Sequence, residues 1–61
     1  KDNGGAYYEA AANYGLAEAM FANGDKEAAK MLFSNANKQA SKIGAKQLAA
    51  EIQAKQKALN I

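Results

Sequence analysis

The sequence of 61 residues contains neither cysteine nor histidine. Without cysteine the chain has no disulfide, and without either residue type it has no ordinary structural zinc site to hold a small domain together. The same two residue types usually supply the nucleophile or the general base at neutral pH. We therefore expect no enzymatic activity, no catalytic residues, no metal site and no cofactor. Stability must come from helix packing, from self-association or from a partner.

Long apolar runs are also missing. A membrane-spanning helix needs about 18–20 consecutive apolar residues, and no segment of the sequence approaches that length. The first five residues do not resemble a signal peptide, and the mean hydropathy of −0.46 argues against a cationic membrane-surface peptide. We therefore expect a soluble chain that does not span a membrane.

Proline, valine, threonine, tryptophan and arginine are absent, whereas alanine fills 16 of the 61 positions. This composition favours helix formers over strand formers and predicts an all-α fold. Alanine adds little buried area, although a larger apolar side chain contributes about 1.5–3 kcal/mol when fully buried. The core of so short a chain is therefore expected to be thin.

The net charge of +2 is distributed unevenly. Residues 1–30 hold three lysines and five acids, whereas residues 31–61 hold five lysines and a single acid, Glu51. Such an asymmetry can steer an acidic partner or a nucleic acid toward the second half. A helix face solvated by lysines is the simpler interpretation.

Residues 1–5 are polar, include two glycines and are expected to form a flexible leader. The remainder, 6–61, is expected to be a single domain of three helices. From Ala6 onward apolar residues recur at spacings of three and four, which predicts a helix over 6–22. The expected core stripe of this helix consists of Tyr7, Ala10, Ala11, Tyr14, Ala17 and Phe21. Gly15 lies within the helix and is expected to mark a close helix contact.

Asn23 and Gly24 predict the end of the first helix because both tolerate the left-handed conformation, and Asp25 is well placed to cap the next helix. A turn this short makes the two helices antiparallel neighbours. The second helix is predicted over 26–43 and the third over 45–59, with a break at Gly44; a continuous helix through Gly44 is the alternative. The expected buried positions are Ala29, Leu32, Phe33, Ala36, Ala40 and Ile43 in the second helix, and Ala45, Leu48, Ala49, Ile52 and Leu59 in the third.

Small and large packing residues follow one another in a specific order in the middle of the chain. They are Leu16-Ala17, Met20-Phe21, Gly24-Asp25, Ala29, Phe33 and Ala36. This pattern resembles the tetratricopeptide repeat, over about residues 10–44. The resemblance implies about one and a half repeats, in which a helical hairpin is followed by a third helix. That helix either begins a truncated second repeat or closes the array, and its polar outer face favours the closing role.

The resemblance also implies a non-enzymatic module that binds a protein partner or copies of itself, as a scaffold or as a small subunit of a larger assembly. The family's groove is lined mainly by the first helix of each pair, which points to Asn13, Leu16, Met20 and Asn23 as partner-binding candidates. For Leu16 and Met20, burial in the core is the alternative. Tyr8 falls outside the core stripe, and as an exposed aromatic residue it is the strongest single candidate for a partner contact.

The second half of the chain supports a competing hypothesis. Residues 28–57 loosely resemble the basic helical hairpin of the bacterial ribosomal protein S20 family, which implies RNA binding. Lys38, Lys42 and Lys46 would align along one face if the helix continued through Gly44. The lack of arginine and the small net charge argue against nucleic acid as the partner. Within the third helix, Glu51 and Lys55 have the spacing of a favourable intrahelical ion pair.

Overall fold

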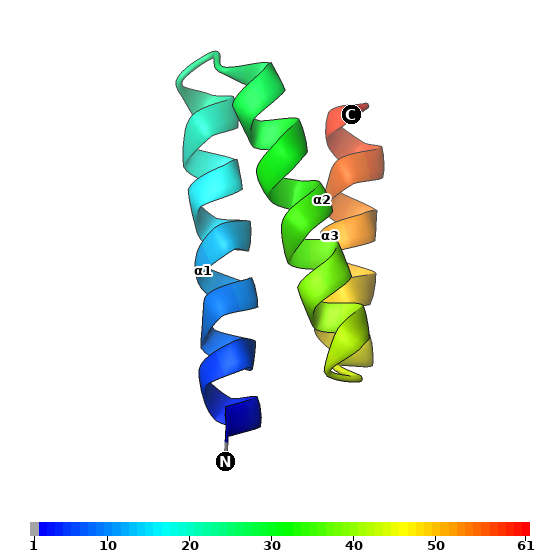
Figure 1. Cartoon of the computed structure of the whole chain (residues 1–61). Coiled ribbons are helices and arrows are strands. Elements are labelled where there is room, and N and C mark those ends of the chain that lie inside the picture. The colour runs from blue at the N-terminus through cyan, green and yellow to red at the C-terminus, as the bar shows by residue number, and fades with distance from the viewer. Residues whose placement is uncertain (1) are drawn as a thin grey trace.

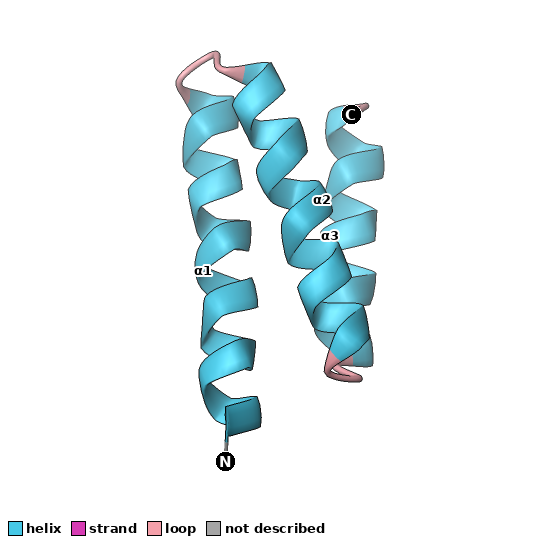
Figure 2. Cartoon of the chain, viewed as in Figure 1, coloured by secondary structure: helices cyan, strands magenta, loops and turns pink. Residues whose placement is uncertain are grey.

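A computed structural model describes residues 2–61, with side chains from residue 5 onward. It consists of three helices, α1 (Asp2–Ala22), α2 (Lys26–Lys42) and α3 (Lys46–Leu59). Two short turns join them, and no strand occurs within these residues (Figures 1 and 2). The expected all-α fold is confirmed.

Consecutive helices run in opposite directions, so α1 and α2 form the expected antiparallel hairpin (Figure 1). The third helix packs against α2, whereas α1 and α3 approach each other at few points. The result is an elongated molecule of 36 × 17 × 12 Å. Each helix therefore packs mainly on its neighbour in the sequence.

The first helix starts earlier than the sequence predicts. It begins at Asp2 and not at Ala6, so residues 2–5, expected to belong to the leader, are helical; Lys1 lies outside the described residues. Glycine in a helix costs about 1 kcal/mol relative to alanine, but it does not prevent helix formation as an internal proline does. The first helix can therefore continue through Gly4 and Gly5.

The turn between α1 and α2 has the predicted structure. Gly24 has a φ of 91°, in the region that favours glycine. The Asp25 N–H donates to the Met20 carbonyl at 2.9 Å and closes the end of α1. The Asp25 carboxylate then accepts a hydrogen bond from the Ala28 N–H at 3.3 Å, as a helix N-cap does. The predicted stop and the predicted cap are both confirmed.

The turn between α2 and α3 resolves the alternative left open at Gly44. The second helix ends at Lys42 and Gly44 has a φ of 76°. The Ala45 N–H donates to the Ala40 carbonyl at 2.8 Å, which is the bond of a glycine-terminated helix. The break is confirmed and the continuous helix is wrong. The third helix begins at Lys46, one residue later than predicted, and its capping residue Ala45 makes no side-chain hydrogen bond.

The core is thin and consists mostly of alanine. Phe33 and Ile52 are the largest side chains that are fully buried, and the Tyr14 ring lies 5.9 Å from that of Phe33. Among the side chains from residue 5 onward, those that are buried are Ala10, Ala17, Ala29, Phe33, Ala36, Ala40, Leu48, Ala49 and Ile52. The predicted core positions Ala11, Tyr14, Phe21, Leu32, Ile43, Ala45 and Leu59 are only half-buried.

Tyr7 is the clearest error in the predicted core, because its side chain is 45% exposed. It lines a shallow hollow beside Gly44, Ala45 and Leu48, at the turn between α2 and α3. The ring lies beside the end of α2, which stops at Lys42, and it is only partly covered there. The helical period predicts the correct direction for Tyr7 but not the length of the partner helix.

Candidate functional site

The side of α1 that is turned away from α2 carries no charge. Its exposed residues are Gly5, Tyr8, Ala12, Gly15, Leu16, Ala19 and Ala22, and we call this set the α1 outer face. These residues recur at spacings of three and four, on the opposite side of the helix from the buried Ala10 and Ala17. The outer faces of surface helices are usually charged or polar. The first helix departs from that pattern because apolar residues occur all around it.

Two large side chains project from the α1 outer face. Tyr8 is 76% exposed and Leu16 is 46% exposed. The Tyr8 ring also packs edge-on against Tyr7, with 6.4 Å between the ring centroids. Eight residues of helix correspond to about 12 Å, so Tyr8 and Leu16 stand roughly two turns apart along one face. Tyr8 occupies the exposed position that its place outside the core stripe predicts.

For Leu16 and Met20, the sequence left open whether each is exposed or buried in the core, and the structure gives a different answer for each. Leu16 lies outside the core, so the hypothesis that it is a core residue is wrong. Met20 is half-buried and packs against the core, as its alternative assignment requires. Gly15 also differs from expectation, because nothing lies within 4 Å of the position where a Cβ would be. It faces solvent instead of marking a helix contact, since it shares the side of α1 that carries Leu16.

Asn13 is turned toward α2. Its Nδ2 donates a hydrogen bond to Gln39 Oε1 at 2.7 Å, and Gln39 Nε2 donates to Glu9 Oε1 at 3.5 Å. This polar network crosses the groove between α1 and α2, where Lys42 also lies. Gln39 was not among the predicted site residues, because nothing in its local sequence signals a hydrogen bond to a residue 26 positions away.

Asn23 occupies the turn after α1, where its side chain is exposed and its N–H donates to the Ala19 carbonyl at 3.0 Å. The five candidate binding residues therefore do not share one face. Tyr8 and Leu16 lie on the α1 outer face. Asn13 lies in the groove between α1 and α2, Met20 packs against the core, and Asn23 lies in the turn after α1.

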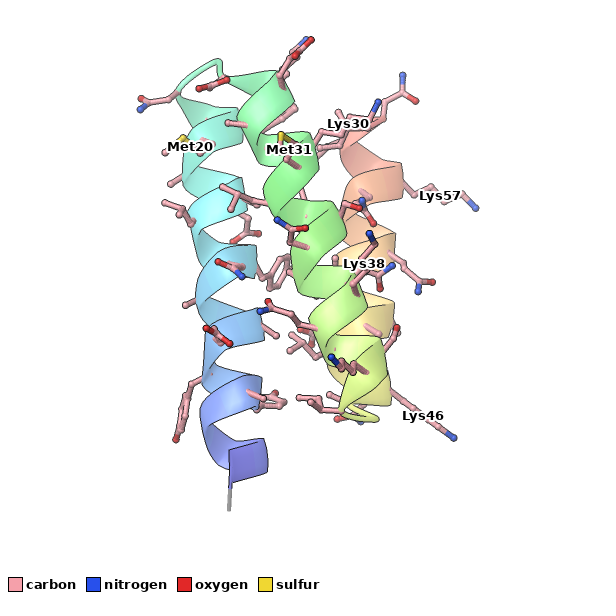
Figure 3. All side chains as sticks on the ribbon, in the orientation of Figure 1. Met20, Lys30, Met31, Lys38, Lys46 and Lys57 are labelled. Atoms are coloured by element: carbon pink, nitrogen blue, oxygen red, sulfur yellow. The ribbon has the colours of Figure 1, made fainter. Side chains whose placement is uncertain are left out.

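Charge is divided between the helices. The described side chains of α1 include Glu9 and Glu18 and no basic residue, whereas α2 and α3 carry seven of the eight lysines. Figure 3 shows Lys30, Lys46 and Lys57 extending from α2 and α3, away from α1. The first helix is thus acidic and the other two are basic.

The break at Gly44 affects the expected lysine row. Lys46 lies in α3, after the turn, so it does not continue the face of α2 that carries Lys38 and Lys42. Lys55 also has a different partner from the one expected. Its Nζ lies 3.2 Å from Oε2 of Glu18 on α1, so its ion pair joins two helices instead of lying within α3 with Glu51.

The described side chains form no cluster of three or more potential metal ligands of the histidine, cysteine or carboxylate type. Over residues 2–61, none of the helices combines the length and the apolar character needed to cross a membrane. Comparisons of the chain with protein-family models, with curated proteins and with solved structures found no match. The α1 outer face is the surface that points most directly to a function.

Proposed function

We propose that this chain is a non-enzymatic protein-interaction module, with a tetratricopeptide-like arrangement of helices, that serves as a scaffold or as a small subunit of a larger assembly. Its partner binds on the α1 outer face. The observation that carries this proposal is the exposure of Tyr8 and Leu16 on a helix face without charge.

Physical chemistry supports an interface at this face. Burial of apolar surface is worth about 25 cal/mol per Å² removed from water, and aromatic residues are frequent centres of binding energy. Tyrosine also loses little conformational freedom when it is held in an interface. The lack of histidine and cysteine supports the non-enzymatic part of the proposal.

The proposal can be tested by photocrosslinking from a defined position. A photoreactive amino acid would replace Tyr8 in one protein and Ser41, an exposed residue of α2, in a control protein. We expect a protein adduct of discrete mass from position 8, absent from position 41 and competed by excess unmodified chain. Failure to form an adduct with any protein, including the chain itself, would contradict the proposal.

RNA binding is the second candidate, favoured by the seven lysines on α2 and α3. An electrostatic RNA complex loses affinity steeply as salt rises, because bound counterions are released from the phosphates. Titration with a structured RNA at two salt concentrations separates the candidates. Tight binding with a steep salt dependence, together with no adduct from position 8, would favour RNA.

A further inference from the structure

We propose that the α1 outer face binds the exposed face of α3 in a second copy of this chain, so that copies associate head to tail. This inference rests on the proposed function and names its partner. It concerns two surfaces that the three-helix fold leaves uncovered at its two sides.

The second surface is the α3 outer face, which we define as Gln47, Ala50, Ala54 and Ala58. All four residues are exposed, and they lie on the opposite side of α3 from the buried Leu48 and Ile52. Because most of them are alanines, this face is shallow and lets another helix approach closely. Large side chains such as Tyr8 and Leu16 can fill such a surface, as ridges of one helix fill the grooves of another.

Charge complementarity selects this pairing. Glu18 and Lys55 already pair with each other within the chain, which leaves Glu9 on the described part of α1 and two lysines, Lys46 and Lys57, against one acid on α3. Of the described charged side chains, two α1 faces placed together would bring carboxylates near one another. Two α3 faces would bring mainly ammonium groups together. The α1 face against the α3 face is the combination with opposite charges, and opposite charges favour the correct partner and orientation.

The lysines are placed to act at the margin of such an interface. Figure 3 shows Lys46 near one end of α3 and Lys57 nearer the other, both extending away from α1 of their own chain. Lys55 is already paired with Glu18 within the chain. Lys46 and Lys57 are therefore the lysines of α3 that face a neighbouring copy.

A head-to-tail interface has a measurable consequence. Such an interface uses a different face from each copy, so each added copy leaves one face unoccupied at the end of the assembly. Association therefore does not stop at the dimer unless a ring closes. We expect the molar mass measured by light scattering to rise with concentration from 6.4 kDa through twice that value and beyond.

Two substitutions test the two faces separately. Leu16→Lys blocks the α1 outer face and Ala54→Lys blocks the α3 outer face, and because both new residues are lysines the two blocked faces cannot pair with each other. Both positions are exposed within helices, and the new residues are good helix formers, so unchanged helicity by circular dichroism can be verified first. Each variant alone is expected to raise the concentration needed for half association at least about tenfold, the factor that corresponds to 1.4 kcal/mol. Ser34→Lys, which adds the same charge on exposed α2, is the matched control and should associate like the parent chain.

The mixture of the two variants gives the decisive result. Each variant keeps the face that the other lacks, so an equimolar mixture should form dimers that grow no further. If Ala54→Lys alone still associates like the parent chain and Leu16→Lys does not, the α1 faces pair with each other and the head-to-tail proposal is overturned. A parent chain that stays monomeric throughout also overturns it; an adduct with a different protein from position 8 would then still support the proposed function, and no adduct would contradict both.

Discussion

Glu18 on α1 and Lys55 on α3 form an ion pair of 3.2 Å between two helices that otherwise meet at few points. Both side chains are well exposed, at 44% and 39% respectively. Water and dissolved ions screen such a pair, so it adds little stability on its own. The pair bridges α1 and α3 on the side of the bundle where these two helices have few other contacts.

We predict that Glu18→Gln lowers the free energy of unfolding by less than about 1 kcal/mol, the usual range for exposed pairs. Urea denaturation at low and at high salt measures this effect, and high salt should remove most of the difference. Glu51→Gln is the matched control, since Glu51 is the partner that spacing alone predicts for Lys55. A larger loss for the control than for Glu18→Gln would contradict the observed pairing.

Gly15→Ala is expected to stabilise the protein. The position is helical and exposed, and an added Cβ would meet nothing within 4 Å. Alanine is favoured over glycine in a helix by about 1 kcal/mol, which in a domain of this size raises the melting temperature by about 4–8 °C. Thermal unfolding followed by circular dichroism measures the shift.

Gly24→Ala is the control for that experiment, because the same substitution is expected to destabilise the protein at this position. Its backbone has a φ of 91°, so a side chain is strained there although the surrounding space is open. We expect a loss of about 1–2 kcal/mol. Equal effects of the two substitutions would show that one of the two backbone conformations is wrong.

Removing the Phe33 ring should unfold the protein or come close to doing so. Phe33 and Ile52 are the largest side chains that are fully buried, and truncation of a buried phenylalanine to alanine costs about 3–5 kcal/mol. A short chain has little stability in reserve. The prediction for Phe33→Ala is a large loss of helicity at 25 °C in circular dichroism.

Met31→Ala is the matched comparison for the core substitution, because Met31 lies two residues away on α2 and is 67% exposed. Its effect should stay within about 0.5 kcal/mol. Retained helicity in Phe33→Ala, or a strong loss in Met31→Ala, would contradict the assignment of the core face of α2.

Substitutions at the first residues before α2 and α3 should have effects of opposite sign, because Asp25 caps α2 and no side chain caps α3. Asp25→Ala removes the hydrogen bond to the Ala28 N–H and should cost about 0.5–2 kcal/mol. Ala45→Ser places an oxygen at the start of α3, where no side chain caps the helix, and should restore a similar amount. Denaturant unfolding of the two single variants and the double variant measures both changes in the free energy of unfolding. Destabilisation by Ala45→Ser would show that the half-buried Ala45 methyl group contributes more than the cap.

Local chemistry explains which parts of the fold were predictable. Gly24, Asp25 and Gly44 act within one turn, through backbone conformation and capping, so they can be recognised without knowing the rest of the molecule. The buried face of α2 was largely predictable for a related reason. Its apolar residues lie on one side only, and that side must face the core.

The first helix was less predictable because apolar residues occur all around it. The period identifies Ala10 and Ala17 as core, but it does not show that Tyr7 lies beside the end of α2, where it is only partly covered, or that Gly15 faces solvent. The partners of Asn13 and Lys55 could not be predicted either, since each lies more than 20 residues away in the sequence. Such pairings depend on how the helices are placed, which local patterns do not encode.

The sequential packing of the three helices has a kinetic consequence. Each helix packs mainly on the next, across turns of only three residues. Contacts between near neighbours in the sequence need little loop closure before they form, and proteins rich in such contacts fold in microseconds to milliseconds. Folding can proceed by closing one hairpin and then adding α3, without waiting for distant segments to find each other.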